Sequence, residues 1–216
     1  MNYKYILFDL DGTIVDSRTG LRNGIMYSLE KTGKMQYLKQ DQLSNCFGAP
    51  LWHAYTKYFS MSAEDADAAV KEYEKYYLSK GMFESKPFPD IIETLEKLNA
   101  MGKSMVIITN GYGVNASKVL EHFGLSKYFE DICGLAFLGA DETKADVIQN
   151  WMKSRNIKDK SKVVMIGDRY FDMNAATICE IDSIGVLYGY GDKQELVSAG
   201  AQRTAESPVA LLQLIE

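Results

Sequence analysis

The sequence predicts an α/β fold in which a doubly wound parallel sheet carries an inserted α-helical domain. Three observations indicate this. Residues 3–8 form a short apolar run rich in aromatic side chains, which is typical of a buried strand. Residues 15–84 show helical spacing without a convincing strand, and strand and helix patterns alternate from Lys86 onward. The predicted Rossmann-like core therefore comprises residues 1–14 and 85–216, and residues 15–84 form a helical cap inserted after the first strand.

The helical cap is predicted to contain one helix at each end and a broken region between them. Apolar residues recur at helical spacing over residues 17–32. Residues 40–59 favour two short helices separated by a Gly-Ala-Pro break at 48–50. Ser62 is a typical N-cap for a longer helix that runs to about Ser79.

The remaining residues alternate between strand and helix patterns separated by Gly and Pro. Strands are expected at 104–109, 131–137, 163–166 and 184–187, and helices at 90–101, 114–123, 143–155, 171–180, 192–200 and 207–215. Because this alternation is typical of βαβ units, the strands are expected to be parallel, with the first strand in the same sheet.

Composition excludes several classes of function. A net charge of −5 over 216 residues argues against a nucleic-acid partner. Cys46, Cys133 and Cys179 are odd in number and widely spaced among apolar residues, which predicts reduced, buried thiols. With only two histidines, a zinc site is not expected. The absence of a basic-then-apolar leader and of an apolar run of membrane length predicts a cytoplasmic protein without a membrane partner, and leaves monomer and dimer open.

Two carboxylates follow the first predicted strand directly. They are Asp9 and Asp11, and Gly12 and Thr13 form the turn after them. An Asp-Gly pair after a strand is also common turn chemistry, so this motif alone proves little. Ligands of open α/β sheets bind at the carboxyl ends of the strands, however, and two acids there can divide the roles of nucleophile and proton donor.

Polar side chains also end the later strands or begin the helices that follow them. These residues are Thr109, Asn110, Lys144, Asp168 and Asp172. Each alone has an ordinary explanation as a turn residue, a solvated lysine or a helix-terminal acid. Because the carboxyl ends of parallel strands share one edge of a sheet, we expect all five to converge on the two N-terminal aspartates.

This set of side chains supplies the groups that phosphoryl transfer needs. Asp9 is the candidate nucleophile, whose carboxylate becomes an aspartyl phosphate that water hydrolyses. Asp11 is the candidate general acid for the leaving alkoxide and then the base for water. Thr109 and Asn110 are candidates to hold phosphate oxygens, and Lys144 to neutralise charge on the phosphate and on Asp9.

A metal is expected in the same place. Asp168 is the candidate ligand, and Asp172, one helical turn later, supports it. A hard, oxygen-rich site without His or Cys favours Mg²⁺.

The ordered motifs make the sequence similar to the haloacid dehalogenase-like hydrolase superfamily over essentially the whole chain. The four matching motifs are Asp9-Leu10-Asp11-Gly12-Thr13, Thr109-Asn110, Lys144, and Gly167-Asp168 with Asp172-Met173. The resemblance implies that the first Asp is the nucleophile and the second the acid/base. It also implies that Mg²⁺ is bound by Asp9, by the backbone carbonyl of Asp11 and by Asp168.

Within the superfamily the chain resembles the phosphoglycolate phosphatase-like branch with a helical cap. The segments that carry this resemblance are Asp16-Ser17, residues 47–51, residues 87–90 and residues 123–129. Residues 144–148 look closer to a bacterial 5′-nucleotidase-like subgroup, and Ala145 stands where many relatives have Pro. The resemblance implies Mg²⁺-dependent hydrolysis of a small phosphorylated metabolite, phosphoglycolate-like, with nucleoside monophosphates as the alternative.

Two further alternatives stay open. A β-phosphoglucomutase-like phosphotransferase retains both aspartates and differs mainly in the cap, so the core motifs do not exclude it. A signalling or binding protein of another class uses phosphorylation of Asp9 without turnover. Asp11 together with a cap fits turnover better than stable phosphorylation.

The cap is expected to select the organic part of the substrate, with the loop at 48–50 facing the site. A short phosphorylated acid needs a positive group, for which the candidates are Arg18, Arg22 and Lys57. A nucleotide needs an aromatic stacking face, for which the candidates are Tyr27, Trp52 and Tyr55. The aromatic stripe of Tyr73, Tyr76 and Tyr77 is more typical of a packing face.

Overall fold

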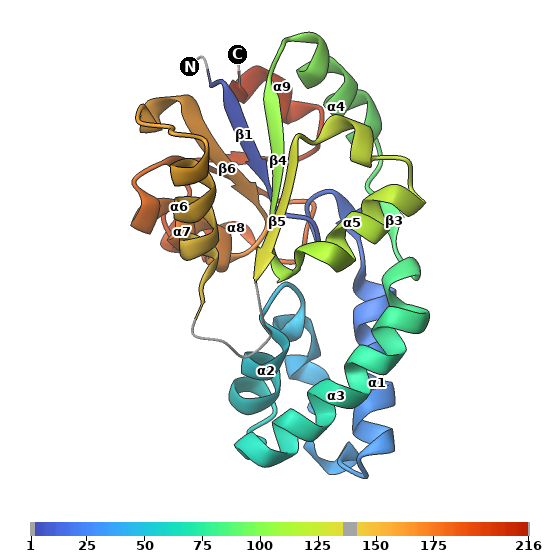
Figure 1. Cartoon of the computed structure of the whole chain (residues 1–216). Coiled ribbons are helices and arrows are strands. Elements are labelled where there is room, and N and C mark those ends of the chain that lie inside the picture. Colours follow the sequence, from blue (N-terminus) through green and yellow to red (C-terminus); the bar gives the residue numbers. More distant parts are fainter. Residues whose placement is uncertain (1–2, 136–141, 216) are drawn as a thin grey trace.

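The computed structural model describes residues 3–135 and 142–215, and its centre is a six-stranded parallel sheet in the order β5-β4-β1-β6-β7-β8 (Figure 1). The strands are β1 (Tyr5–Phe8), β4 (Ser104–Tyr112), β5 (Asp131–Leu135), β6 (Val163–Gly167), β7 (Asp182–Val186) and β8 (Arg203–Ala205). β1 lies between β4 and β6, where Leu7 pairs with Val106 on one side and Met165 on the other. The predicted α/β class is confirmed. Residues 136–137 of the strand expected at 131–137 lie outside the described residues, and β8 is too short for its pattern to be seen in the sequence.

Helices cover both faces of the sheet, as a doubly wound fold requires (Figure 1). They are α4 (Ile91–Ala100), α5 (Gly113–His122), α6 (Lys144–Ser154), α7 (Tyr170–Cys179), α8 (Lys193–Ser198) and α9 (Ala210–Ile215). Alternation along β1 explains the two layers, because Ile6 and Phe8 pack with α4, α5 and α9, whereas Leu7 packs with α6 and α7.

The helical cap has its own apolar core and lies below the sheet in Figure 1. Its elements are α1 (Arg18–Lys31), 3₁₀ turns at Met35–Tyr37 and Gln40–Cys46, α2 (Leu51–His53), a π-helical turn at Ala54–Tyr58, α3 (Ala63–Ser79) and a 3₁₀ turn at Gly81–Phe83. The Ser62 hydroxyl accepts a hydrogen bond from the Asp65 amide at 3.2 Å and caps α3. The first of the two short helices expected over 40–59 is a 3₁₀ helix instead of an α-helix. None of the helices within the described ranges has both the length and the apolar character needed to cross a bilayer.

A two-stranded antiparallel ribbon joins the helical cap to the core. It consists of β2 (Val15–Asp16) and β3 (Lys86–Pro87), so the chain leaves and re-enters the core at one place. Asp11 forms an isolated bridge with Val15, which puts this junction next to the first acidic motif. A two-residue pairing is too short to give a periodic signal, and the sequence did not predict it.

The three cysteines are free thiols, but they differ in burial. Cys46 and Cys179 are buried, in agreement with the prediction, whereas Cys133 on β5 is only partly buried. The prediction was wrong for Cys133 because β5 is the edge strand of the sheet among the described residues, with a neighbouring strand on one side only.

Candidate active site

Three carboxylates and one ammonium group meet at the carboxyl ends of β1 and β6. The Lys144 Nζ lies 2.8 Å from Asp9 Oδ1 and 2.5 Å from Asp172 Oδ1, and all three side chains are buried. Asp168 completes the group, because Asp9, Asp168 and Asp172 each offer an oxygen and these oxygens lie within 4.8 Å of one another. The fold thus gathers side chains that are separated by more than 150 positions of sequence, from Asp9 to Asp168.

Glycines make this close approach possible. Gly12 has a φ of 89°, and a Cβ at this position would lie 2.1 Å from Asp168 Oδ2. A Cβ at Gly189 would lie 2.2 Å from Asp168 Cβ, and one at Gly167 would lie 2.1 Å from Asp172 Cγ. Larger residues at these three positions would therefore push the two carboxylates out of place.

The substitution Gly12→Ala is expected to lower the free energy of unfolding by about 2–4 kcal/mol, because a left-handed φ and a steric overlap act together. The matched control is Gly33→Ala, since Gly33 has a φ of 66° with no atom within 4 Å of the added Cβ. Urea unfolding of both variants separates strain from overlap. Equal losses in the two variants would contradict a steric role for Gly12.

Burial and crowding decide the electrostatics of the acidic cluster. Burial raises the pKa of Asp9 to about 7, an effect that Lys144 opposes and Asp172 adds to. Burial also raises the pKa of Asp168 well above its usual range, and Asp9 and Asp172 raise it further. Burial alone would lower the pKa of Lys144, but Asp172 and Asp9 hold it above its ordinary value, so this side chain stays cationic.

The cluster is therefore short of positive charge, with three carboxylates and one ammonium group. A divalent cation held by carboxylate oxygens would supply the missing charge. The donor set fits Mg²⁺, since every candidate ligand in the cluster is a hard oxygen and neither His nor Cys takes part.

Asp11 lies at the border between the acidic cluster and a cavity, and its side chain is partly exposed. Its enclosed position raises the pKa of the Asp11 carboxyl, and a hydrogen bond from Ser17 opposes this rise. Ser17 also contacts Tyr190, whose hydroxyl accepts from the Ser17 amide at 2.9 Å. The Tyr190 amide donates to Asp168 Oδ2 at 2.8 Å. Tyr190 therefore connects the surroundings of Asp11 with those of Asp168.

The sequence did not predict a role at the site for the loop at 188–191, which contains Tyr190. The Tyr188 hydroxyl donates to the Thr13 carbonyl at 3.1 Å, so the loop holds the first acidic motif from a second point. The signal was present as a Tyr-Gly-Tyr-Gly run directly after a strand, at the sheet edge where ligands bind.

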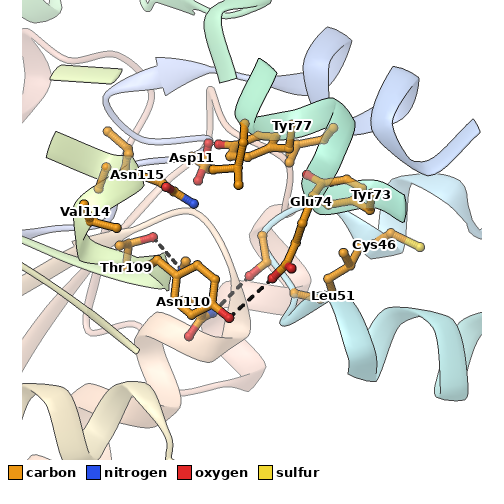
Figure 2. Close-up of a pocket in the computed structure, with 18 of the residues that line it drawn as sticks. Asp11, Cys46, Leu51, Tyr73, Glu74, Tyr77, Thr109, Asn110, Val114 and Asn115 are labelled. Carbon is orange, nitrogen blue, oxygen red and sulfur yellow. Dashed lines mark hydrogen bonds between the residues drawn. The ribbon is translucent and has the colours of Figure 1, made fainter. Parts of the chain in front are cut away.

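Thr109 is the last buried residue of β4 and Asn110 is the next residue of the same strand, and both line the cavity. The Thr109 hydroxyl accepts a hydrogen bond from the Gly111 amide at 3.1 Å. The Asn110 side-chain amide donates to the Gly48 carbonyl at 3.0 Å (Figure 2). Asn110 thus ties the edge of the sheet to the Gly-Ala-Pro loop of the helical cap, and this loop does face the site.

The cavity has a volume of about 440 Å³ and lies between the sheet edge and the helical cap (Figure 2). Asp9, Asp11, Thr109 and Asn110 line it on the core side, and residues of α1 and α3 line it on the cap side. One end of the cavity is therefore acidic and polar, and the opposite end belongs to the cap.

The side chains expected to select the substrate do not line this cavity. They are Arg18, Arg22, Tyr27, Trp52, Tyr55 and Lys57. Arg18 pairs with Asp16 at 2.8 Å, and the Trp52 indole donates to Asp67 at 2.9 Å. Tyr55 is fully buried in the core of the cap.

Instead, Tyr73 and Tyr77 of the aromatic stripe line the cavity, with stacked ring centroids 5.4 Å apart. The predicted packing face is confirmed, because Tyr73 lies in the core of the cap and Tyr77 packs against that core, but both residues line the cavity as well. Tyr73 and Tyr77 are four residues apart and therefore share one face of α3. This face packs against the core of the cap and also borders the cavity.

Comparisons with known proteins agree with this arrangement. A family model described as "Haloacid dehalogenase-like hydrolase" matches residues 6–186. A crystal structure described as that of a "predicted phosphatase from Clostridium acetobutylicum" is similar, with 37% identity, a TM-score of 0.92, and coverage of 100% of this chain and 99% of that chain. A 5′-nucleotidase from Pseudomonas aeruginosa is 29% identical over 216 residues, which cover 100% of this chain and 97% of that protein. A phosphoglycolate phosphatase from Vibrio parahaemolyticus is 29% identical over 223 residues, covering 98% of this chain and 96% of that protein.

Proposed function

The chain belongs to the haloacid dehalogenase-like hydrolase family, and from this membership we propose that it is a Mg²⁺-dependent phosphomonoesterase that works through an aspartyl phosphate on Asp9. One observation carries the proposal most directly. Lys144 contacts both Asp9 and Asp172, Asp168 lies within reach of the same point, and Asp9 borders a cavity that also contains Asp11. This is the set of groups that phosphoryl transfer requires.

In the first step, a carboxylate oxygen of Asp9 attacks phosphorus, and the bond between phosphorus and the leaving oxygen breaks. Asp11 gives its proton to that oxygen, so that the organic part leaves as an alcohol. In the second step, Asp11 takes a proton from water, and the oxygen of this water attacks phosphorus and frees the Asp9 carboxylate.

The other residues hold these groups and balance their charge. Lys144 orients Asp9 and neutralises charge on the transferred phosphoryl group. Asp172 fixes Lys144 and accepts a hydrogen bond from the Arg169 amide at 3.0 Å. Thr109 and Asn110 contribute donors to the phosphate end of the cavity. When bound by oxygens of Asp9, Asp11 and Asp168, Mg²⁺ would neutralise the charge that builds up around phosphorus.

Release of inorganic phosphate in the presence and absence of Mg²⁺ tests the proposal against its alternatives. A phosphatase releases many equivalents of phosphate per enzyme from p-nitrophenyl phosphate or a metabolite ester, and a chelator stops it. A phosphotransferase forms a bisphosphate from a sugar phosphate with little free phosphate. A signalling protein takes up about one phosphate per chain and then stops. Either of the last two results would overturn the proposed hydrolase.

The substitution Asp11→Asn is expected to slow hydrolysis of an alkyl phosphate by about 10²–10⁴-fold, because the alkoxide must leave without a proton. With p-nitrophenyl phosphate, whose leaving group needs no proton, the variant should give a rapid burst of about one p-nitrophenolate per active site. Slow turnover should follow, since the base for the second step is missing. Rapid-mixing absorbance measurements detect the burst. Unchanged turnover of the alkyl ester would remove the acid/base role from Asp11.

A further inference from the structure

Glu74 places a carboxylate on the cap side of the cavity. It lies on α3 beside Tyr73, and its side chain reaches from the helix into the cavity (Figure 2). The Tyr112 hydroxyl, on β4, donates to Glu74 Oε1 at 3.4 Å. This carboxylate therefore faces the end of the cavity that is left for the organic part of a substrate.

Glu74 lines the cavity without an ion-pair partner among the described residues. The charged residues that line the cavity are Asp9, Asp11, Glu74 and Lys118. The two aspartates belong to the phosphate end, and Lys118 is an exposed side chain on α5. Within residues 3–135 and 142–215, no ammonium or guanidinium group forms an ion pair with Glu74. The organic end of the cavity thus combines one carboxylate, Glu74, with one exposed ammonium group, Lys118, that forms no ion pair with it.

The remaining lining is apolar, aromatic or an uncharged amide. Besides the two tyrosines of α3, it includes Leu21, Ile25, Leu51, Leu78, Val114 and Asn115. A volume of about 440 Å³ with such walls suits a ring system better than a two-carbon chain. The Glu74 carboxylate on one wall is a hydrogen-bond acceptor, so a ring bound there has to supply a donor.

We propose that Glu74 is a specificity-determining residue that selects phosphomonoesters with an uncharged ring bearing N–H or O–H donors, as in a nucleoside, and rejects short phosphorylated carboxylic acids. The inference rests on the proposed phosphatase function and names its substrate class. A donor on the ring replaces water at the Glu74 carboxylate, whereas a second carboxylate on the substrate meets the like charge of Glu74, which only the exposed ammonium of Lys118 offsets across solvent. Rejection of the wrong ester is thus as much a part of the selectivity as attraction of the right one.

The test compares kcat/KM for nucleoside 5′-monophosphates, one purine and one pyrimidine, with kcat/KM for phosphoglycolate, all in excess Mg²⁺. The wild type, Glu74→Gln and Glu74→Lys are measured beside Glu72→Gln. The control residue Glu72 lies on the same helix, pairs with Lys75 and does not line the cavity. Each preparation is also assayed with p-nitrophenyl phosphate and melted by circular dichroism, so that loss of fold or of all activity is seen directly.

For the wild type, the better nucleotide is expected to exceed phosphoglycolate by at least about tenfold in kcat/KM. This ratio should fall about tenfold in Glu74→Gln and reverse in Glu74→Lys, and Glu72→Gln should keep the wild-type ratio. A wild type that prefers phosphoglycolate, or a ratio unmoved by both Glu74 variants, overturns the selectivity while the phosphatase function stands. A wild type inactive on every ester, p-nitrophenyl phosphate included, overturns the function and this inference together.

Discussion

The substitution Asp9→Asn is expected to lower turnover of every phosphomonoester by at least about 10³-fold, while the chain stays folded. The amide of Asn has nearly the shape of the carboxylate but is not a nucleophile toward phosphorus. The fold should tolerate the change, because Lys144 keeps its contact of 2.5 Å with Asp172 and one crowded negative charge is removed. The measurement is steady-state phosphate release with Mg²⁺, together with a thermal melt.

A control for this variant is Asp67→Asn, since Asp67 is an exposed acid of the helical cap whose carboxylate accepts from the Trp52 indole. It should keep the wild-type rate. A rate in Asp9→Asn that matches this control would show that another group attacks phosphorus, and the proposed aspartyl phosphate would be wrong.

The second large effect is expected at Asp168, where function and stability should change in opposite directions. In Asp168→Asn, hydrolysis should fall by about 10²-fold or more, because a ligand that holds the cation is lost. Without metal, the same variant should be more stable than the wild type by about 1–2 kcal/mol, because its neutral amide does not crowd Asp9 and Asp172. A carboxylate that serves function can destabilise the metal-free fold. Removal of the Asp168 carboxylate is therefore expected to lower the rate of hydrolysis and to raise the free energy of unfolding.

Magnesium titrations followed by thermal melting separate the two effects. At a Mg²⁺ concentration of 100 times its Kd, the wild type should gain about 2.7 kcal/mol, whereas Asp168→Asn should gain little. A variant that Mg²⁺ stabilises as strongly as the wild type would remove Asp168 from the metal site.

The pH dependence of this Mg²⁺ effect has a definite sign. Burial raises the pKa of Asp9 from 3.8 to about 7 when no metal is bound, so the folded chain holds a proton that the unfolded chain has lost. Asp9 therefore favours the metal-free fold at low pH, and this contribution disappears as pH rises through about 7. Because the proposed Mg²⁺ site needs the ionised carboxylate, the stabilisation by Mg²⁺ should shrink below about pH 7. Asp9→Asn should lose the part of this pH dependence that comes from Asp9, whereas the raised pKa of Asp168 should keep the rest.

Much of the fold was predictable because it follows from local patterns. The apolar residues of β1 and β6 occur in short buried runs, and glycines and prolines separate the helices of the core. The strands missed were β2, β3 and β8, all of them three residues or shorter. Such short strands form through pairing with distant segments, and they are too short to show an alternating pattern of apolar residues in the sequence.

The candidate site divides in the same way. The acidic end was predictable because Asp9, Asp11 and Asp168 each follow a strand and Thr109 lies near the carboxyl end of another, and parallel strands bring their carboxyl ends to one edge. The cap side of the cavity was not predictable, because the spacing of residues in the sequence does not indicate which face of α3 is directed toward the sheet. Arg18 and Trp52 carry suitable chemistry but have partners elsewhere, whereas Tyr77 and Glu74 gained their place from the docking of the helical cap.

By itself, then, the sequence determined the class of fold and the order in which polar residues occur at the ends of the strands, and it supports the chemistry proposed for the acidic cluster. These depend on residue type and on neighbours close in sequence. The tertiary structure alone decided that Lys144 sits between Asp9 and Asp172, that Tyr190 joins Ser17 to Asp168, and that Glu74 faces the cavity. The physical reason is that these contacts arise from packing between elements far apart in the chain, where shape and burial rather than local pattern set which side chains meet.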